Sequence, residues 1–93
     1  MDKTVKMEAH KATPAEIAKT KSWGTWSKEP SEFPYSYEEM ETCYILEGEA
    51  EVTDNKGNKT SFKAGDWVVF HPGLECVWRI SKTIKKKYVF GNL

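Results

Sequence analysis

The strongest constraint on the fold is a two-residue period that begins at Thr42 and is interrupted by turn residues about every eight to ten positions. Residues 49–52 alternate polar and apolar side chains, and residues 67–70 form a β-branched and aromatic run. A period of two places successive side chains on opposite faces of a strand, whereas a helix repeats every 3.6 residues. Residues 54–58 (DNKGN) and 71–73 (HPG) are typical of tight turns. The pattern predicts a small all-β sandwich or barrel.

Individual strands are expected at residues 42–47, ending at Gly48, and then at 49–52, 60–62, 67–70, 74–80 and 88–90. Trp23 and Trp26 flank Gly24 and fit a short strand or a lid segment. Pro30 and Pro34 exclude a helix in the stretch that follows.

The first 22 residues are expected to form an N-terminal arm with one short helix. Thr4 to Met7 alternates in a way that fits a short edge strand. Thr13-Pro14-Ala15-Glu16 combines a capping Thr, a Pro at the first helical position and a Glu that completes a capping box. These signals predict a helix over Pro14 to Lys19.

A chain of 93 residues suits one domain, with the arm at about 1–22 and the barrel at about 23–90. Four Trp, four Tyr and four Phe supply the large apolar side chains of its core. The uncharged runs are too short to span a membrane, and the first residues lack the pattern of a secretion signal. We therefore expect a cytoplasmic protein with no membrane partner.

The 14 basic and 14 acidic residues cancel, which argues against a nucleic-acid partner, since that needs a basic surface. The charge is nevertheless segregated, because residues 29–54 contain nine acids and no Lys or Arg, whereas residues 55–93 contain eight basic residues and two acids. We expect these segments to meet as cross-strand pairs on the outer face of the barrel. Lys82, Lys85, Lys86 and Lys87 are interpreted as a solvated edge.

Two segments carry a family resemblance. Glu41-Thr42-Cys43-Tyr44-Ile45-Leu46-Glu47-Gly48 and the later Gly65-Asp66-Trp67-Val68-Val69-Phe70-His71-Pro72-Gly73 resemble the two motifs of the cupins, which are double-stranded β-helix (jelly-roll) barrels. Within the cupins, the closer resemblance is to small single-domain members grouped with (S)-ureidoglycine aminohydrolase and the ethanolamine-utilisation cupin. The resemblance covers about residues 23–88 and implies a cupin jelly-roll barrel. It says little about activity, since one fold serves many functions.

The resemblance also bears on metal binding, because many cupins hold a metal with His-x-His, a Glu and a further His. In this sequence the first two positions hold Tyr35 and Tyr37, or Pro34 and Ser36 with the longer spacing. The Glu is kept as Glu41, and Cys76 stands at the last His position. We therefore expect no His-based metal site and no cofactor. A metalloenzyme built on Glu41, Cys43, Cys76 and a Tyr is the alternative.

The expected site follows from strand parity within that barrel. Glu41 and Cys43 point inward, as do Cys76 and Trp78, and the two tyrosines meet them at the mouth. A carboxylate enclosed by rings is desolvated, which favours its protonated form and suits acid or base chemistry. Equally, Glu41 could be a satisfied core group bonded to a Tyr hydroxyl. The candidate acid or base is Glu41, and the candidate ligand-binding residues are Trp26, Tyr35, Tyr37, Cys43, Cys76 and Trp78.

The leading hypothesis is a cupin that binds a small polar or planar metabolite in its barrel. Two alternatives are open: an enzyme that acts on a small nitrogen- or carbonyl-containing metabolite, and a structural or interaction module whose barrel is filled. The two cysteines are interpreted as free thiols, with a metal site and a redox pair as alternatives. A homodimer is expected, since small jelly rolls often hide an edge or an apolar face in this way.

Overall fold

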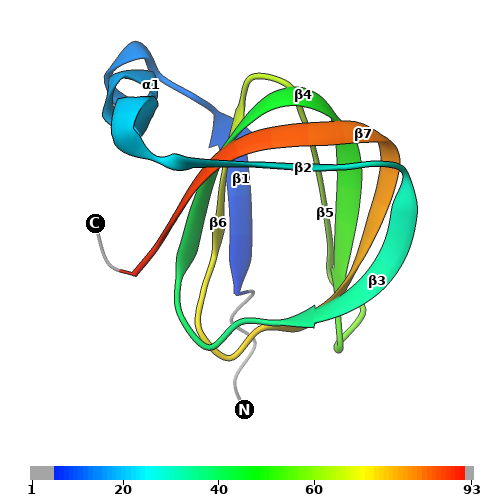
Figure 1. The fold of residues 1–93 in the computed structure, drawn as a ribbon. Helices are drawn as coiled ribbons and strands as arrows, with labels where there is room; N and C mark the ends of the chain where they lie inside the picture. Colours follow the sequence, from blue (N-terminus) through cyan, green and yellow to red (C-terminus); the bar gives the residue numbers. More distant parts are fainter. Residues whose placement is uncertain (1–5, 92–93) are drawn as a thin grey trace.

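The computed structural model describes residues 6–91 and shows the predicted all-β barrel with one short helix (Figure 1). The elements in chain order are β1 (Met7–Lys11), α1 (Pro14–Lys19), a 3-10 turn (Thr20–Ser22), β2 (Gly24–Lys28), β3 (Ser31–Ser36), β4 (Glu41–Asp54), β5 (Lys59–Lys63), β6 (Asp66–Phe70) and β7 (Glu75–Phe90). No helix within residues 6–91 is long and apolar enough to cross a membrane.

The strands form one antiparallel sheet that curls around a common interior (Figure 1). The main path runs β1-β6-β4-β7-β2, while β3 pairs with β7 and β5 pairs with β4. The long strand β7 pairs with β3 along residues 75–80 and with β2 along residues 84–88, and β4 lies on its other side. Because three strands meet on β7, its inward side chains are surrounded by residues far apart in the sequence.

Gly48 lies at a bend within β4, where the sequence predicts that one strand ends and another begins. The sequence predicts that a strand ends there, but β4 continues through it with register shifts against β7 between Ile45 and Ala50. Gly48 has a φ of +94°, and a Cβ at this position would lie 2.1 Å from the carbonyl oxygen of Thr83. Glycine is therefore required for the bulge rather than for a strand end. The expected separate strands at 74–80 and 88–90 are likewise one bent strand, β7.

The N-terminal arm contributes both a strand and the predicted helix. Thr13 Oγ1 accepts from the backbone N–H of Glu16 at 3.2 Å, and Glu16 Oε1 accepts from the N–H of Thr13 at 2.9 Å, which confirms the capping box. The arm's strand is β1, which begins at Met7 and pairs with β6. Thr4 and Val5, where an edge strand is expected, lie outside the described residues.

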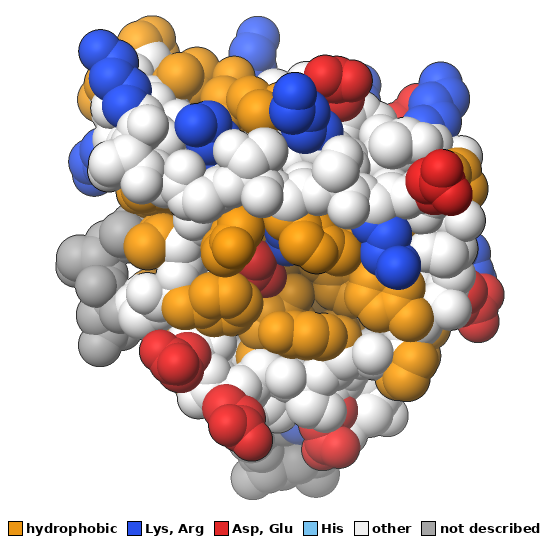
Figure 2. Space-filling view, viewed as in Figure 1, with side chains coloured by type: hydrophobic (Ala, Val, Ile, Leu, Met, Phe, Trp, Pro, Cys, Tyr) orange, Lys and Arg blue, Asp and Glu red, His pale blue; other side chains and the backbone are white. Residues whose placement is uncertain are grey.

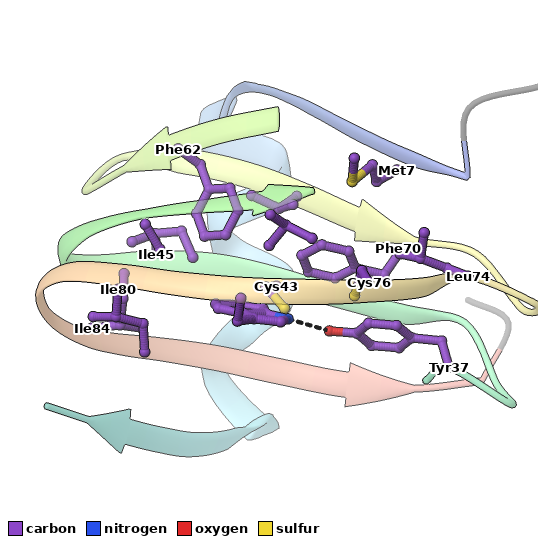
Figure 3. Close-up of a cluster of buried hydrophobic side chains, with 14 residues drawn as sticks. Met7, Tyr37, Cys43, Ile45, Phe62, Phe70, Leu74, Cys76, Ile80 and Ile84 are labelled. Atoms are coloured by element: carbon purple, nitrogen blue, oxygen red, sulfur yellow. Dashed lines mark hydrogen bonds between the residues drawn. The ribbon is translucent and has the colours of Figure 1, made fainter. Parts of the chain in front are cut away.

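The barrel interior is filled by stacked and edge-to-face rings (Figure 3). Phe70 is at the centre of this packing: its ring lies 4.8 Å from that of Tyr37, 5.5 Å from that of Trp78 and 6.1 Å from that of Phe62. Aliphatic side chains such as Ile45 and Ile80 complete the core. Trp78 thus packs against the core rings on one side and lines a hollow at the barrel mouth on the other.

The outer face contains the expected pairing between the acidic and basic segments. Lys82 Nζ lies 2.7 Å from Glu49 Oε2, and Arg79 lies 3.0 Å from Glu32 and 3.5 Å from Glu51. These side chains are exposed or half-exposed, so solvent screens each pair and its contribution to stability is small. Three acids of residues 29–54 thus meet two basic residues of residues 55–93 across strands at the surface.

Candidate functional site

A buried ion pair lies at the mouth of the barrel. Lys86 Nζ donates to Glu41 Oε2 at 2.8 Å, and the two residues are 5% and 3% exposed. This overturns the interpretation of Lys86 as part of a solvated edge, although its neighbour Lys85 is exposed. Glu41 is thus bonded to an ammonium group and also to the hydroxyl of Tyr37, so the Tyr hydroxyl considered as its partner is one of two partners. In this arrangement the Glu41 carboxylate accepts a hydrogen bond from the ammonium group.

Strand register explains why Lys86 points inward. Lys86 pairs with Ile45 of β4 and with Trp26 of β2. It lies two positions after the buried Ile84, on the same face of β7. Its ammonium lies 4.8 Å from the ring centre of Trp26 and 4.8 Å from that of Trp78. Two indole faces and one carboxylate therefore surround a single cation, an arrangement in which cation–π attraction adds to the ion pair.

The ionisation of Lys86 is maintained by its neighbours. Burial alone would lower the pKa of Lys86, but the Cys43 sulfur and the Glu41 carboxylate outweigh it, and the pKa is raised above its ordinary value. Glu41 and Lys86 thus form a charged pair that is neutral as a unit. A buried unit of this kind is costly to break, because either partner alone would be an uncompensated charge.

Tyr37 connects the pair to the core. Its hydroxyl accepts from the indole N–H of Trp78 at 3.3 Å, the contact drawn as a dashed line in Figure 3. Burial raises the pKa of Tyr37 well above its ordinary value, and the charge of Glu41 raises it further. Tyr37 is therefore a neutral phenol that positions Trp78.

These residues form one wall and the floor of a hollow of about 170 Å³. We call it the aromatic pocket. Figure 2 shows the opening as a ring of hydrophobic side chains with an acidic group visible inside it. Glu41 and Lys86 supply the polar groups, and seven rings complete the lining: Trp26, Phe33, Tyr35, Tyr37, Trp78, Tyr88 and Phe90.

The rim and the interior of the aromatic pocket differ in exposure. Tyr35 and Phe90 are 42% and 43% exposed, whereas Tyr37 is buried. Phe33 stacks on Trp78 at 6.0 Å with an interplanar angle of 9°. The pocket is thus an apolar funnel that narrows onto one ion pair, a form typical of small-molecule sites with a few oriented polar groups.

Five of the seven sequence-predicted site residues line the aromatic pocket: Glu41, Trp26, Tyr35, Tyr37 and Trp78. Cys43 and Cys76 lie outside its lining. Cys43 is fully buried, and burial raises the pKa of its thiol above the ordinary value. Cys76 donates to the backbone oxygen of Tyr35 at 3.3 Å and lines a different hollow. Burial, followed by the charges of Asp54 and Glu41, raises the pKa of Cys76 to about 11, so both thiols are protonated at neutral pH.

The donor set does not fit the metal that many cupins hold. Within residues 6–91, no three side chains of His, Cys, Asp or Glu lie close enough together to hold a metal ion. Glu41 is bonded to an ammonium, and Cys76 lies outside the aromatic pocket. His10 and His71 pair with Glu16 and Glu8.

Another hollow, of about 490 Å³, lies over β4, β5 and β7. Its lining includes the exposed Arg79, which is already paired with Glu32 and Glu51, and side chains of both charges such as Lys63 and Asp66. It is more open to solvent than the aromatic pocket and is lined by fewer rings. The smaller aromatic pocket is therefore the better candidate site.

Four lining residues were not predicted from the sequence: Phe33, Lys86, Tyr88 and Phe90. Three of them lie on β7 at every second position, on the same face of the strand: Lys86, Tyr88 and Phe90. This spacing is a signal in the sequence: it places Lys86 on the same face as two aromatic rings, and Lys85 and Lys87 on the opposite face.

Comparison with known proteins bears on the whole barrel. A family model described as the EutQ-like cupin domain matches residues 15–88. Among solved structures, a DUF861 family protein from Thermotoga maritima is 40% identical, with a TM-score of 0.87 over 90% of this chain and 98% of that chain. A search of curated proteins finds no match to this chain.

More distant structures share the fold alone. A protein assigned as ethanolamine utilization protein Q of Salmonella typhimurium is 22% identical, with a TM-score of 0.67, and covers 94% of this chain and 58% of that one. The EutQ protein of Clostridium difficile is 18% identical, with a TM-score of 0.67 over 73% of this chain and 53% of that one. Both of these proteins are considerably longer than the part that this chain matches.

Proposed function

Because this chain belongs to the EutQ-like cupin family, whose model matches residues 15–88, we propose that it uses its barrel to bind a small polar or planar molecule in the aromatic pocket. The observation that carries the proposal is the convergence of seven rings on one buried ion pair. Such a pocket buries apolar surface of a ligand and orients it through a few polar groups.

The volume of the pocket distinguishes binding from a filled structural module. A water molecule occupies about 30 Å³ in the liquid. The pocket of about 170 Å³ is larger than one or two waters would need. An apolar cavity of about 150 Å³ is known to accept benzene. A single six-membered ring with a small polar substituent therefore matches the space at the barrel mouth.

The polar groups favour binding without a His-based metal site. Glu41 offers acceptor oxygens, Lys86 offers N–H donors, and the described residues gather no set of metal ligands around them. A ligand would be oriented by hydrogen bonds to this pair and held by the surrounding rings.

The proposal is tested by a thermal-shift screen with small polar molecules, repeated on two matched variants. Phe90→Ala removes an exposed ring from the rim of the aromatic pocket, whereas Val77→Ala removes a 37% exposed side chain on the same strand that lies outside it. We expect ligands that stabilise the protein to lose most of their effect in Phe90→Ala and to keep it in Val77→Ala. Equal loss in both variants, or a screen with no stabilising ligand, would contradict the proposal.

The cellular setting that we propose is a homodimer in the cytoplasm. Cys43 and Cys76 are both free thiols, which suits a reducing compartment. On the main path of the sheet, β1 and β2 are the end strands, and such edges are common sites of strand addition between subunits. Light scattering on the purified protein checks the assembly, with twice the chain mass of 10.7 kDa as the expected value.

A further inference from the structure

The floor of the aromatic pocket is electrically neutral, and this limits what it can accept. Glu41 and Lys86 lie 2.8 Å apart with 3% and 5% of their surfaces exposed. Each charge is balanced by the other in a site that excludes most water. A ligand with a net charge would be desolvated on entry without a free counter-charge to meet it.

The aromatic faces do not compensate a cationic ligand. In this pocket the chain's own Lys86 ammonium already lies 4.8 Å from the centres of both Trp26 and Trp78. A second cation would therefore meet like charge next to the faces that would otherwise attract it. An anion would face the Glu41 carboxylate as well as the electron-rich ring faces. Neither sign of charge is favoured.

The hydrogen-bonding groups of the floor are complementary to a particular neutral group. An ammonium only donates hydrogen bonds, and a carboxylate only accepts them. With the two side by side in Glu41 and Lys86, a molecule that presents an acceptor oxygen next to an N–H matches both at once. The surrounding rings and the small volume favour a planar molecule.

We infer that the aromatic pocket selects small, neutral, planar molecules that carry a carbonyl oxygen and an N–H on one edge, as in a carboxamide or lactam, over cations and anions of the same shape. The carbonyl oxygen accepts from Lys86, the N–H donates to Glu41, and the planar body packs against the rim rings Tyr35 and Phe90. This inference rests on the proposed function and specifies the class of ligand.

Three probes of one shape test the selection: benzamide, benzoate and benzamidinium, which have charges of 0, −1 and +1. Binding is followed by NMR through the indole N–H signal of Trp78 in the isotope-labelled protein. We expect benzamide to bind at least tenfold more tightly than either charged probe. The inference is overturned if a charged probe binds as tightly as benzamide.

The same titration separates the two proposals. If none of the three probes binds but other small molecules shift the Trp26 and Trp78 signals, the ligand class is wrong and the binding function stands. If no small molecule shifts these signals, the proposed function itself fails.

Charge variants give a second test with a predicted sign. Glu41→Gln leaves Lys86 unbalanced, so benzoate should gain at least tenfold relative to benzamide. Lys86→Met leaves Glu41 unbalanced, so benzamidinium should gain instead. The control is Glu49→Gln, which breaks the exposed pair with Lys82 and should leave the order of the probes unchanged. An unchanged affinity ratio of benzoate to benzamide in folded Glu41→Gln, or of benzamidinium to benzamide in folded Lys86→Met, would overturn the inference. If both single variants fail to fold, the neutral double variant Glu41→Gln with Lys86→Gln should keep benzamide as the tightest probe, and loss of that order would overturn it.

Discussion

Trp26 of β2 and Lys86 of β7 are directly opposed in the sheet, and the Lys86 ammonium lies 4.8 Å from the centre of the Trp26 ring. This contact joins a residue near the start of the barrel to one near its end. On the other side of β7, Glu41 binds the same ammonium from β4. Lys86 therefore connects β7 to β2 on one side and to β4 on the other, and the aromatic pocket depends on these contacts.

Lys86→Met is expected to destabilise the protein by about 3–5 kcal/mol, because it leaves the Glu41 carboxylate buried without a counter-charge. Lys85→Met is the matched control on the adjacent, exposed position, where a change within about 0.5 kcal/mol is expected. Urea unfolding of both variants at neutral pH measures the difference. Similar losses in the two variants would show that Lys86 is not buried as described.

The double variant Glu41→Leu with Lys86→Met is expected to be more stable than either single variant. Replacing a whole buried ion pair by apolar side chains of similar size is often neutral or stabilising, whereas removing one partner is costly. The four unfolding free energies of the double-mutant cycle give the coupling between the residues. Additive losses would mean that the two side chains do not interact in the folded state.

Gly48→Ala and Gly57→Ala should differ sharply, although both glycines have positive φ, at +94° and +88°. A Cβ on Gly57 meets nothing within 4 Å, so its cost is that of the left-handed backbone, about 1–2 kcal/mol. A Cβ on Gly48 would lie 2.1 Å from the Thr83 oxygen, and the bulge in β4 cannot form without movement of β7. We expect Gly48→Ala to unfold or to lose several times more stability. Equal melting temperatures would contradict the assigned bulge.

Stability is expected to fall as the pH rises above about 9. Burial raises the pKa values of Cys43, Cys76 and Tyr37, and that of Lys86 is raised by its neighbours. The folded protein therefore keeps protons that the unfolded chain releases. For Cys76 the stabilisation is complete below its ordinary pKa of 9.0 and is lost as the pH rises through about 11. Each retained proton gives a slope of about 1.4 kcal/mol per pH unit.

Variants check this assignment. Cys43→Ala and Tyr37→Phe each remove one such group and should flatten the decline in unfolding free energy between pH 9 and 11. Tyr35→Phe, which changes an exposed side chain, should leave the slope unchanged. A flat stability profile across this range in the unaltered protein would contradict the buried, protonated state of these groups.

The sequence predicted the barrel, the helix and much of the site because each depends on local pattern. Alternation placed Glu41 on an inward face, and the structure buries it. Parity gives a face but not a depth. Cys43 lies beside Glu41 and Lys86 as expected but is not part of the lining of the aromatic pocket, and Cys76 lines a different hollow. Depth depends on how strands cross, which is a non-local property.

Lys86 shows most clearly what local pattern could not provide. Within the run Lys85-Lys86-Lys87 each residue has the same chemistry, and the run as a whole is typical of a solvated edge. Its central residue is buried because residues 41–45 of β4 pair in continuous register with residues 86–90 of β7, which places Glu41 and Lys86 on the same face. The partner of a buried charge is thus fixed by register across 45 positions of sequence.

The central claim, that the aromatic pocket binds a small molecule, is tested most directly by the four tryptophan indole signals during titration with benzamide. Trp26 and Trp78 line the pocket, whereas Trp23 and Trp67 pack against each other at 5.3 Å and lie outside its lining. We predict saturable shifts of the Trp26 and Trp78 signals while those of Trp23 and Trp67 stay in place. Shifts confined to Trp23 and Trp67, or no saturable shift of any indole with benzamide or other small polar molecules, would contradict the claim.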